Sequence, residues 1–218
     1  MTWDELTHPW QCCLEDAWAA YCGGSTGHPI GAVVTDAEGQ VIARSRSRVG
    51  VVGPEGLYLH NGRLAHAEVR ALLALDYQRY DPPSACILYT TTEPCPMCFG
   101  AFYMSGLREL HYASRDPYAG SVNLLGTPPY LARKPLKIVG PERPDLEIVI
   151  MALNVEWRLR YRGGPHEDVV LAAWATVVPR GVQLGTMLFE SGDLRRMRGE
   201  GMSAARVFDQ LVGRVQAV

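Results

Sequence analysis

Two short stretches, Ala65-His66-Ala67-Glu68 and Glu93-Pro94-Cys95-Pro96-Met97-Cys98, decide the fold because each one begins a predicted helix. Apolar residues recur at helical spacing after the first stretch, which predicts a helix over residues 65–80. Residues 86–91 form an apolar run that predicts a buried strand, and a second helix is predicted over residues 95–105. We therefore expect both stretches to meet beside a strand end, with His66 in the first turn of its helix.

The residue types in these stretches are those of a catalytic metal site. One histidine and two cysteines, His66, Cys95 and Cys98, match the three protein ligands that catalytic Zn²⁺ typically has, with the fourth tetrahedral position left for water. The two cysteines fall at the start of their helix, where the helix dipole stabilises thiolate, the form that binds metal. We expect Zn²⁺ as the cofactor.

Glu68 is the residue that suggests hydrolysis. A carboxylate beside a zinc-activated water can accept its proton and pass it on to the substrate, and His-x-Glu followed by Pro-Cys-x-x-Cys is the signature of zinc-dependent nucleobase deaminases. The predicted catalytic residues are Glu68 and Cys95, whose backbone amide at the helix start can stabilise developing charge. Taken alone, a Cys-x-x-Cys pair is equally typical of a redox pair or of half a structural zinc site.

The order of elements around the two stretches indicates the fold class. A helix is predicted over residues 9–21, a hairpin of strands over residues 29–35 and 40–47, and a further strand over residues 108–113. Helices alternating with strands in this order predict an α/β protein, a three-layer α-β-α sandwich with a mixed central sheet.

The C-terminal part departs from this alternation. Short apolar runs at residues 136–139 and 146–152 are interpreted as strands, and a helical tail follows from about Pro165. We divide the chain into a deaminase domain, residues 1–150, and a C-terminal helical extension packed on it, residues 151–218. Apolar helical stripes are usually core, so the tail is interpreted as packing or oligomer contact, with a lid over the site as the alternative.

Composition bounds the partners and the compartment. The chain has 218 residues, 47% of them hydrophobic, a formal net charge of -2 and a pI near 6.3, which disfavours nucleic acid as a general partner. Six cysteines without a disulfide-like framework fit a reducing compartment. Neither a secretory signal nor a membrane span is indicated, and a cytoplasmic location is expected.

These motifs resemble the cytidine deaminase-like superfamily, in particular the branch of guanine deaminase, yeast-type cytosine deaminase and the tRNA adenosine deaminases. The resemblance rests on residues 27–34, 65–68 and 88–101 and covers roughly residues 9–116. It implies a homodimer and a pocket for a small heterocycle. The residues that we assign to substrate binding are Pro29, Ser47, Asn61, Ala67, Glu93, Pro94 and Asp116.

One departure from that branch concerns the substrate. Its members commonly carry an asparagine at the end of the second strand, where this chain has Ser47, and serine lacks the paired donor and acceptor of an amide. The first hypothesis is a zinc hydrolase that deaminates a free purine base or related small heterocycle, with guanine-like substrates favoured. The alternatives are a nucleoside or cytosine deaminase, a tRNA adenosine-to-inosine deaminase, and a noncatalytic module whose zinc is closed by a fourth ligand such as His60 or His111.

Overall fold

The structure, a computed structural model, describes residues 1–50 and 62–216 of the chain. The strands are β1 Gly31–Thr35, β2 Val41–Arg46, β3 Ile87–Thr92, β4 Glu109–Ser114 and β5 Lys137–Val139. The helices are α1 His8–Cys22, α2 Ala67–Leu73, α3 Pro96–Ser105, α4 Pro144–Tyr161, α5 Pro165–Val177, α6 Pro179–Ser191, α7 Asp193–Gly199 and α8 Ala204–Val215. Short 3-10 helices lie at Trp3–Glu5, Gly24–Thr26, Pro83–Ala85 and Val122–Leu124.

The strands form one mixed sheet in the order β2-β1-β3-β4-β5. Strand β1 is antiparallel to both β2 and β3, whereas β3, β4 and β5 are parallel to one another. The predicted hairpin and the predicted mixed sheet are confirmed.

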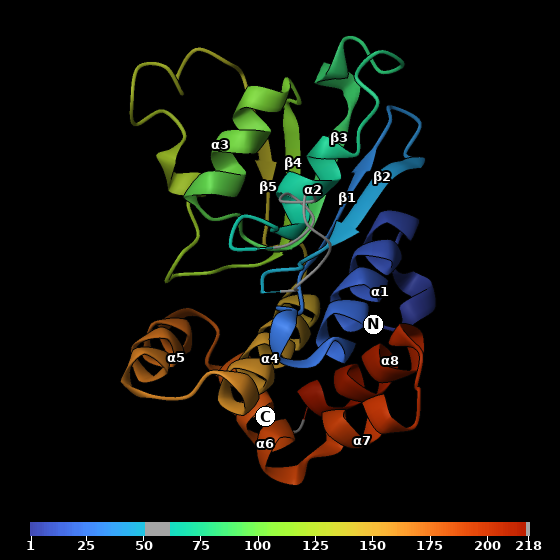
Figure 1. The fold of residues 1–218 in the computed structure, drawn as a ribbon, viewed down its shortest axis with the longest axis vertical. Coiled ribbons are helices and arrows are strands. Elements are labelled where there is room, and N and C mark those ends of the chain that lie inside the picture. Colours follow the sequence, from blue (N-terminus) through green and yellow to red (C-terminus); the bar gives the residue numbers. More distant parts are fainter. Residues whose placement is uncertain (51–61, 217–218) are drawn as a thin grey trace.

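Helices cover both faces of the sheet, and each face has its own apolar core. Because side chains of a strand alternate between faces, Val33 packs into one core and its neighbours Ala32 and Val34 into the other. The first core is built with α1, α4, α6 and α8, and the second with α2 and α3 (Figure 1). The three-layer α/β architecture is therefore confirmed.

Two predicted elements differ from the structure. Residues 146–152 belong to helix α4 and not to a strand: Pro144 stands at its start, and residues 146–157 are buried on all sides, so the apolar run has no helical periodicity that could identify it. Helix α2 ends at Leu73, well before Tyr80, and Leu73 itself is exposed. The backbone after it turns toward the Asp81-Pro82 step.

The C-terminal helices α5 to α8 gather at one end of the molecule, below the sheet in Figure 1. The last of them begins after Ser203, whose hydroxyl accepts a hydrogen bond from the Arg206 amide. Helix α4 runs through residue 150, lies against β4 and packs along α6, so it joins the sheet to this helical end. The division of the chain at residue 150 stays a prediction.

Candidate active site

The strand arrangement brings four chain segments to one end of the sheet, where the carboxyl ends of the parallel strands lie. The parallel strands β3 and β4 end there, and their carboxyl ends lead to Thr92 and Asp116. Strand β1 begins at the same end of the sheet at Gly31, and β2 ends there at Arg46, just before Ser47, because Gly31 pairs with Arg46 in the antiparallel register. Loops at the carboxyl ends of parallel strands are where α/β proteins form ligand sites.

Helices α2 and α3 both begin at this end of the sheet. His66 precedes α2 as its N-cap with extended backbone, and Cys95 takes the same place before α3. The expectation that His66 lies within the first helical turn is therefore wrong by one position. An N-cap residue keeps non-helical backbone, which lets its side chain turn across the helix start.

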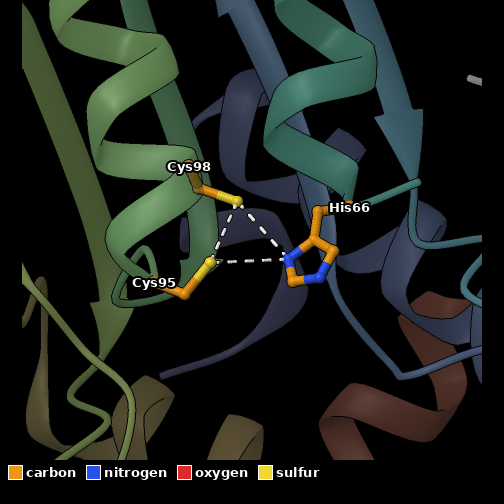
Figure 2. A group of neighbouring side chains, drawn as sticks. All are labelled: His66, Cys95 and Cys98. Carbon is orange, nitrogen blue, oxygen red and sulfur yellow. Dashed lines mark hydrogen bonds between the residues drawn. The ribbon is translucent and has the colours of Figure 1, made fainter. Parts of the chain in front are cut away.

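The three candidate ligands converge on one point, as Figure 2 shows. The Nδ1 atom of His66 lies 3.7 Å from Cys95 Sγ and 3.4 Å from Cys98 Sγ, and the two sulfurs are 3.5 Å apart. Tetrahedral zinc with ordinary Zn–N and Zn–S bond lengths separates such donors by about 3.5 to 3.8 Å. The donor types and their spacing both fit a zinc ion.

The site favours the thiolate that metal binding requires. Hydrogen bonds from Cys98 and His66 lower the pKa of Cys95 to about 4, although burial opposes them. In return, the hydrogen bond to Cys95 and burial raise the pKa of Cys98 far above its usual value. The surroundings of Cys95 therefore favour the thiolate, which is the form that binds metal.

Glu68, the second residue of α2, lies directly beside this triad. Its side chain is only 3% exposed, its Oε2 lies 3.4 Å from Cys98 Sγ, and the Thr90 hydroxyl donates to its Oε1 at 3.2 Å. Burial raises the pKa of Glu68. A buried carboxyl with a raised pKa is suited to carry a proton between two partners.

No fourth protein ligand joins the triad within the part of the chain that the structure describes. His111, one of the two candidates, lies on β4 and faces two other carboxylates. Its Nε2 atom is 2.6 Å from Glu109 Oε1, and its Nδ1 atom is 3.7 Å from Glu142 Oε2. The other candidate, His60, lies outside the described residues. An open fourth position is typical of catalytic zinc.

A pocket of about 150 Å³ opens beside the triad. Four of the predicted substrate residues line it, namely Ser47, Ala67, Glu93 and Asp116, whereas Pro29 and Pro94 do not, and Asn61 lies outside the described residues. The lining residues that the sequence did not suggest are His28, Ile30, Val49, Thr92, Ala119 and Arg158.

Two of the acidic lining residues also hold the surrounding chain. Both oxygens of Glu93 accept backbone amides, from Asp116 at 3.1 Å and Val122 at 3.3 Å. Asp116 Oδ1 accepts the indole N–H of Trp174 at 2.8 Å, which ties helix α5 to the pocket wall. The geometry therefore gives both carboxylates a structural task in addition to any contact with a ligand.

Comparison with known proteins agrees with this geometry. The family described as "Cytidine and deoxycytidylate deaminase zinc-binding region" matches residues 1–114. A probable cytosine deaminase of Schizosaccharomyces pombe is 31% identical over 137 residues, covering 56% of this chain and 76% of that protein. A tRNA-specific adenosine deaminase of Agrobacterium fabrum is 34% identical over 119 residues, covering 54% of this chain and 71% of that protein.

Guanine deaminases complete the comparison. The enzyme of Bacillus subtilis is 38% identical over 93 residues, covering 40% of this chain and 51% of that protein. A solved structure of guanine deaminase from Nitrosomonas europaea superposes with a TM-score of 0.50 at 27% identity, covering 71% of this chain and 86% of that one. The names of these relatives differ in substrate, and this chain, which matches the zinc-binding region over residues 1–114, belongs to the cytidine and deoxycytidylate deaminase family.

Proposed function

We propose that this chain is a zinc-dependent hydrolytic deaminase that converts an amino group of a free purine base, or of a related small heterocycle, to a carbonyl with release of ammonia. The observation that carries the proposal is the buried carboxylate of Glu68 beside the His66, Cys95 and Cys98 triad. A purely structural metal site has no use for an unligated carboxylate in that place. Guanine-like substrates are favoured because two of the similar proteins are guanine deaminases.

The residues divide the work of the reaction. His66, Cys95 and Cys98 would hold the zinc ion, which lowers the pKa of a water molecule to about 7 and so supplies the nucleophile. Glu68 would carry two protons in turn: one from the attacking water to a ring nitrogen, and then the remaining proton of the added hydroxyl to the amine. The C–N bond would then break, ammonia would leave and the carbonyl would form. Thr90 fixes the orientation of the Glu68 carboxylate through its hydroxyl.

Glu68→Gln is the direct test. We expect zinc-loaded Glu68→Gln to keep its metal content and its unfolding temperature but to lose ammonia release by at least about 100-fold, since proton transfer contributes roughly 10²- to 10⁴-fold. The substrates are free purines and pyrimidines, their nucleosides, and a tRNA anticodon stem-loop. Glu109→Gln, which removes a carboxylate outside the pocket, is the matched control.

Full activity of Glu68→Gln, or no turnover of any compound by zinc-loaded wild type, would falsify the proposal. Turnover of the stem-loop alone would establish a second candidate function, the editing of tRNA. One observation favours that candidate: Arg46 and Arg48 flank the pocket residue Ser47 and line a depression beside it. Phosphate contacts from these arginines would weaken as salt rises.

The assembly and the compartment are part of the same proposal. No helix of the described residues is long and apolar enough to cross a membrane. We propose that the protein acts in the cytoplasm, as its cysteine usage suggests, and that it forms a homodimer, as the family resemblance implies.

A further inference from the structure

Helix α4, outside the region that matches the family, contributes Arg158 to the pocket. Its guanidinium is held from two sides: Nη1 lies 2.5 Å from Glu167 Oε2, and its carbon lies 5.2 Å from the centre of the Trp174 ring. Glu167 and Trp174 both belong to α5 and both are buried. Arg158 therefore has a fixed place in the pocket wall, although its side chain is 16% exposed.

Most of the hydrogen-bonding capacity of Arg158 remains unused. A guanidinium carries five N–H donors, and Glu167 is its one hydrogen-bond partner among residues 1–50 and 62–216. The ion pair with Glu167 uses the Nη1 side of the guanidinium and leaves its other donors without a partner among the described residues. A preorganised fork of this kind binds an oxygen acceptor with little loss of side-chain entropy.

The neighbouring side chains make this end of the pocket a poor place for a cation. Burial, together with the positive charges of Arg158 and Arg162, lowers the pKa of the pocket residue His28 to about 3. The Nε2 atom of His28 lies 3.4 Å from Arg162 Nη2, and its ring packs on Trp157 with centres 4.0 Å apart. His28 is thus a neutral imidazole beside two guanidinium groups, all oriented by α4 and the residues next to it.

We propose that Arg158 is a specificity-determining residue, which binds an acceptor oxygen of the substrate at a position other than the carbon that loses the amino group. This inference rests on the deaminase function proposed above and narrows its substrate class. The oxygen belongs either to a ring carbonyl or to an acid group. A substrate whose only polar group at that position is a second amine is excluded, because the N–H donors of that amine would then face the N–H donors of Arg158.

The test compares wild type with the double variant Arg158→Gln/Glu167→Gln, which removes the guanidinium without leaving Glu167 as an unpaired buried charge. The control is Arg160→Gln/Glu156→Gln, which removes an equally short ion pair of 2.5 Å from the same helix but away from the pocket. Matched substrates differ by one oxygen-bearing group: guanine and 2-aminopurine, cytosine and 4-aminopyrimidine, and guanosine monophosphate and guanosine.

We expect the Arg158 double variant to lower kcat/KM for the oxygen-bearing member of one pair by about 10- to 100-fold, mostly through KM, while its partner compound changes little. The pair that responds identifies the oxygen as carbonyl or phosphate. An equal loss on both members of every pair would mean a merely structural role, and unchanged selectivity would mean no contact; either result overturns the inference.

Calorimetric binding separates this inference from the proposed function. If wild type turns over none of the compounds but binds the oxygen-bearing members more tightly, and the double variant loses that preference, the inference holds and the deaminase proposal fails. If wild type binds both members of each pair equally, or binds neither, the inference is wrong whatever the activity.

Discussion

Thr90 shows how a single hydroxyl can prepare the catalytic carboxylate. The side chain is fully buried on β3 and donates to Glu68 Oε1 at 3.2 Å. Hydrogen bonds to charged groups contribute about 1.5 to 3 kcal/mol. The hydroxyl also lies 3.2 Å from the Thr92 carbonyl oxygen, and we assign its one proton to the carboxylate, the stronger acceptor. Thr90 is a positioning residue, because it acts through Glu68 and lines neither the pocket nor the metal triad.

Thr90→Val keeps the shape of the side chain and removes its hydroxyl. We expect kcat to fall by about 10-fold or more with KM nearly unchanged, because substrate binding does not use Thr90 but proton transfer by Glu68 does. Steady-state kinetics with zinc-loaded protein measure both constants. Thr90→Ser keeps a donor in the same place and should retain most of kcat; equal losses in both variants would contradict the positioning role.

The sequence could predict the metal triad and Glu68 because each motif keeps its own residues at one helix start, and the deaminase signature names the two motifs together. It could not predict Thr90 or Arg158. Thr90 reaches the site because β3 is paired in one particular register with β1, and Arg158 reaches it because α4 packs across the sheet. Long-range pairing and packing of this kind leave no local pattern in the residues themselves.

Among the elements, α4 holds the most unexpected position. Its residues 146–157 are all buried, since β4 lies on one side of the helix and α6 and α8 lie on others. Residues 146–152 are apolar apart from Glu147, so they have the same local sequence signature as a buried strand, which explains the wrong prediction. Two features of the sequence indicate a helix here: Pro144 followed by acidic residues, as in a first helical turn, and a run longer than a typical strand.

The contact between α4 and α6 depends on two small residues. Gly181 and Gly185 lie four positions apart on one face of α6, against Met151 and Val155 of α4. A Cβ atom at position 185 would stand 2.5 Å from Val155 Cβ, closer than packed atoms tolerate. The two helix backbones therefore approach as closely as glycine permits.

Gly185→Ala should accordingly destabilise the protein. Overpacking costs roughly 1 to 3 kcal/mol, more than the gain in helix propensity from glycine to alanine. Urea denaturation measures the free energy of unfolding. Gly213→Ala in α8, where a new Cβ meets nothing within 4 Å, is the control and should stabilise the protein by up to about 1 kcal/mol. Equal effects of the two substitutions would contradict the proposed close contact.

At the scale of the whole molecule, the α/β part and the C-terminal helical part both contribute residues to the pocket wall. The starts of α2 and α3, beside the sheet, supply the metal triad and Glu68. Helix α4 supplies Arg158, and Trp174 of α5 donates a hydrogen bond to Asp116. The predicted extension, residues 151–218, therefore contacts the pocket directly and does more than pack against the rest of the chain. Neither half of the predicted division forms the described pocket wall alone.

The side of the molecule that carries α2 and α3 exposes large apolar side chains. Met104 is 65% exposed and Tyr130 is 47% exposed, and the Tyr130 hydroxyl lies 3.5 Å from Met104 Sδ. Leu73 and Tyr77, at the end of α2 and in the turn after it, are 56% and 40% exposed. Apolar groups gathered on one side of a protein surface are typical of an interaction surface, so we place the proposed homodimer contact there.

Met104→Glu tests that placement. A carboxylate buried in a dimer interface without a partner costs several kcal/mol, so we expect the variant to sediment as a monomer at concentrations where wild type is a dimer. Sedimentation velocity over a range of protein concentrations measures the change. Val169→Glu, at a 59% exposed apolar position on α5, is the matched control and should leave the dimer intact. A dimeric Met104→Glu variant, or dissociation caused by Val169→Glu alone, would move the contact to the C-terminal helices.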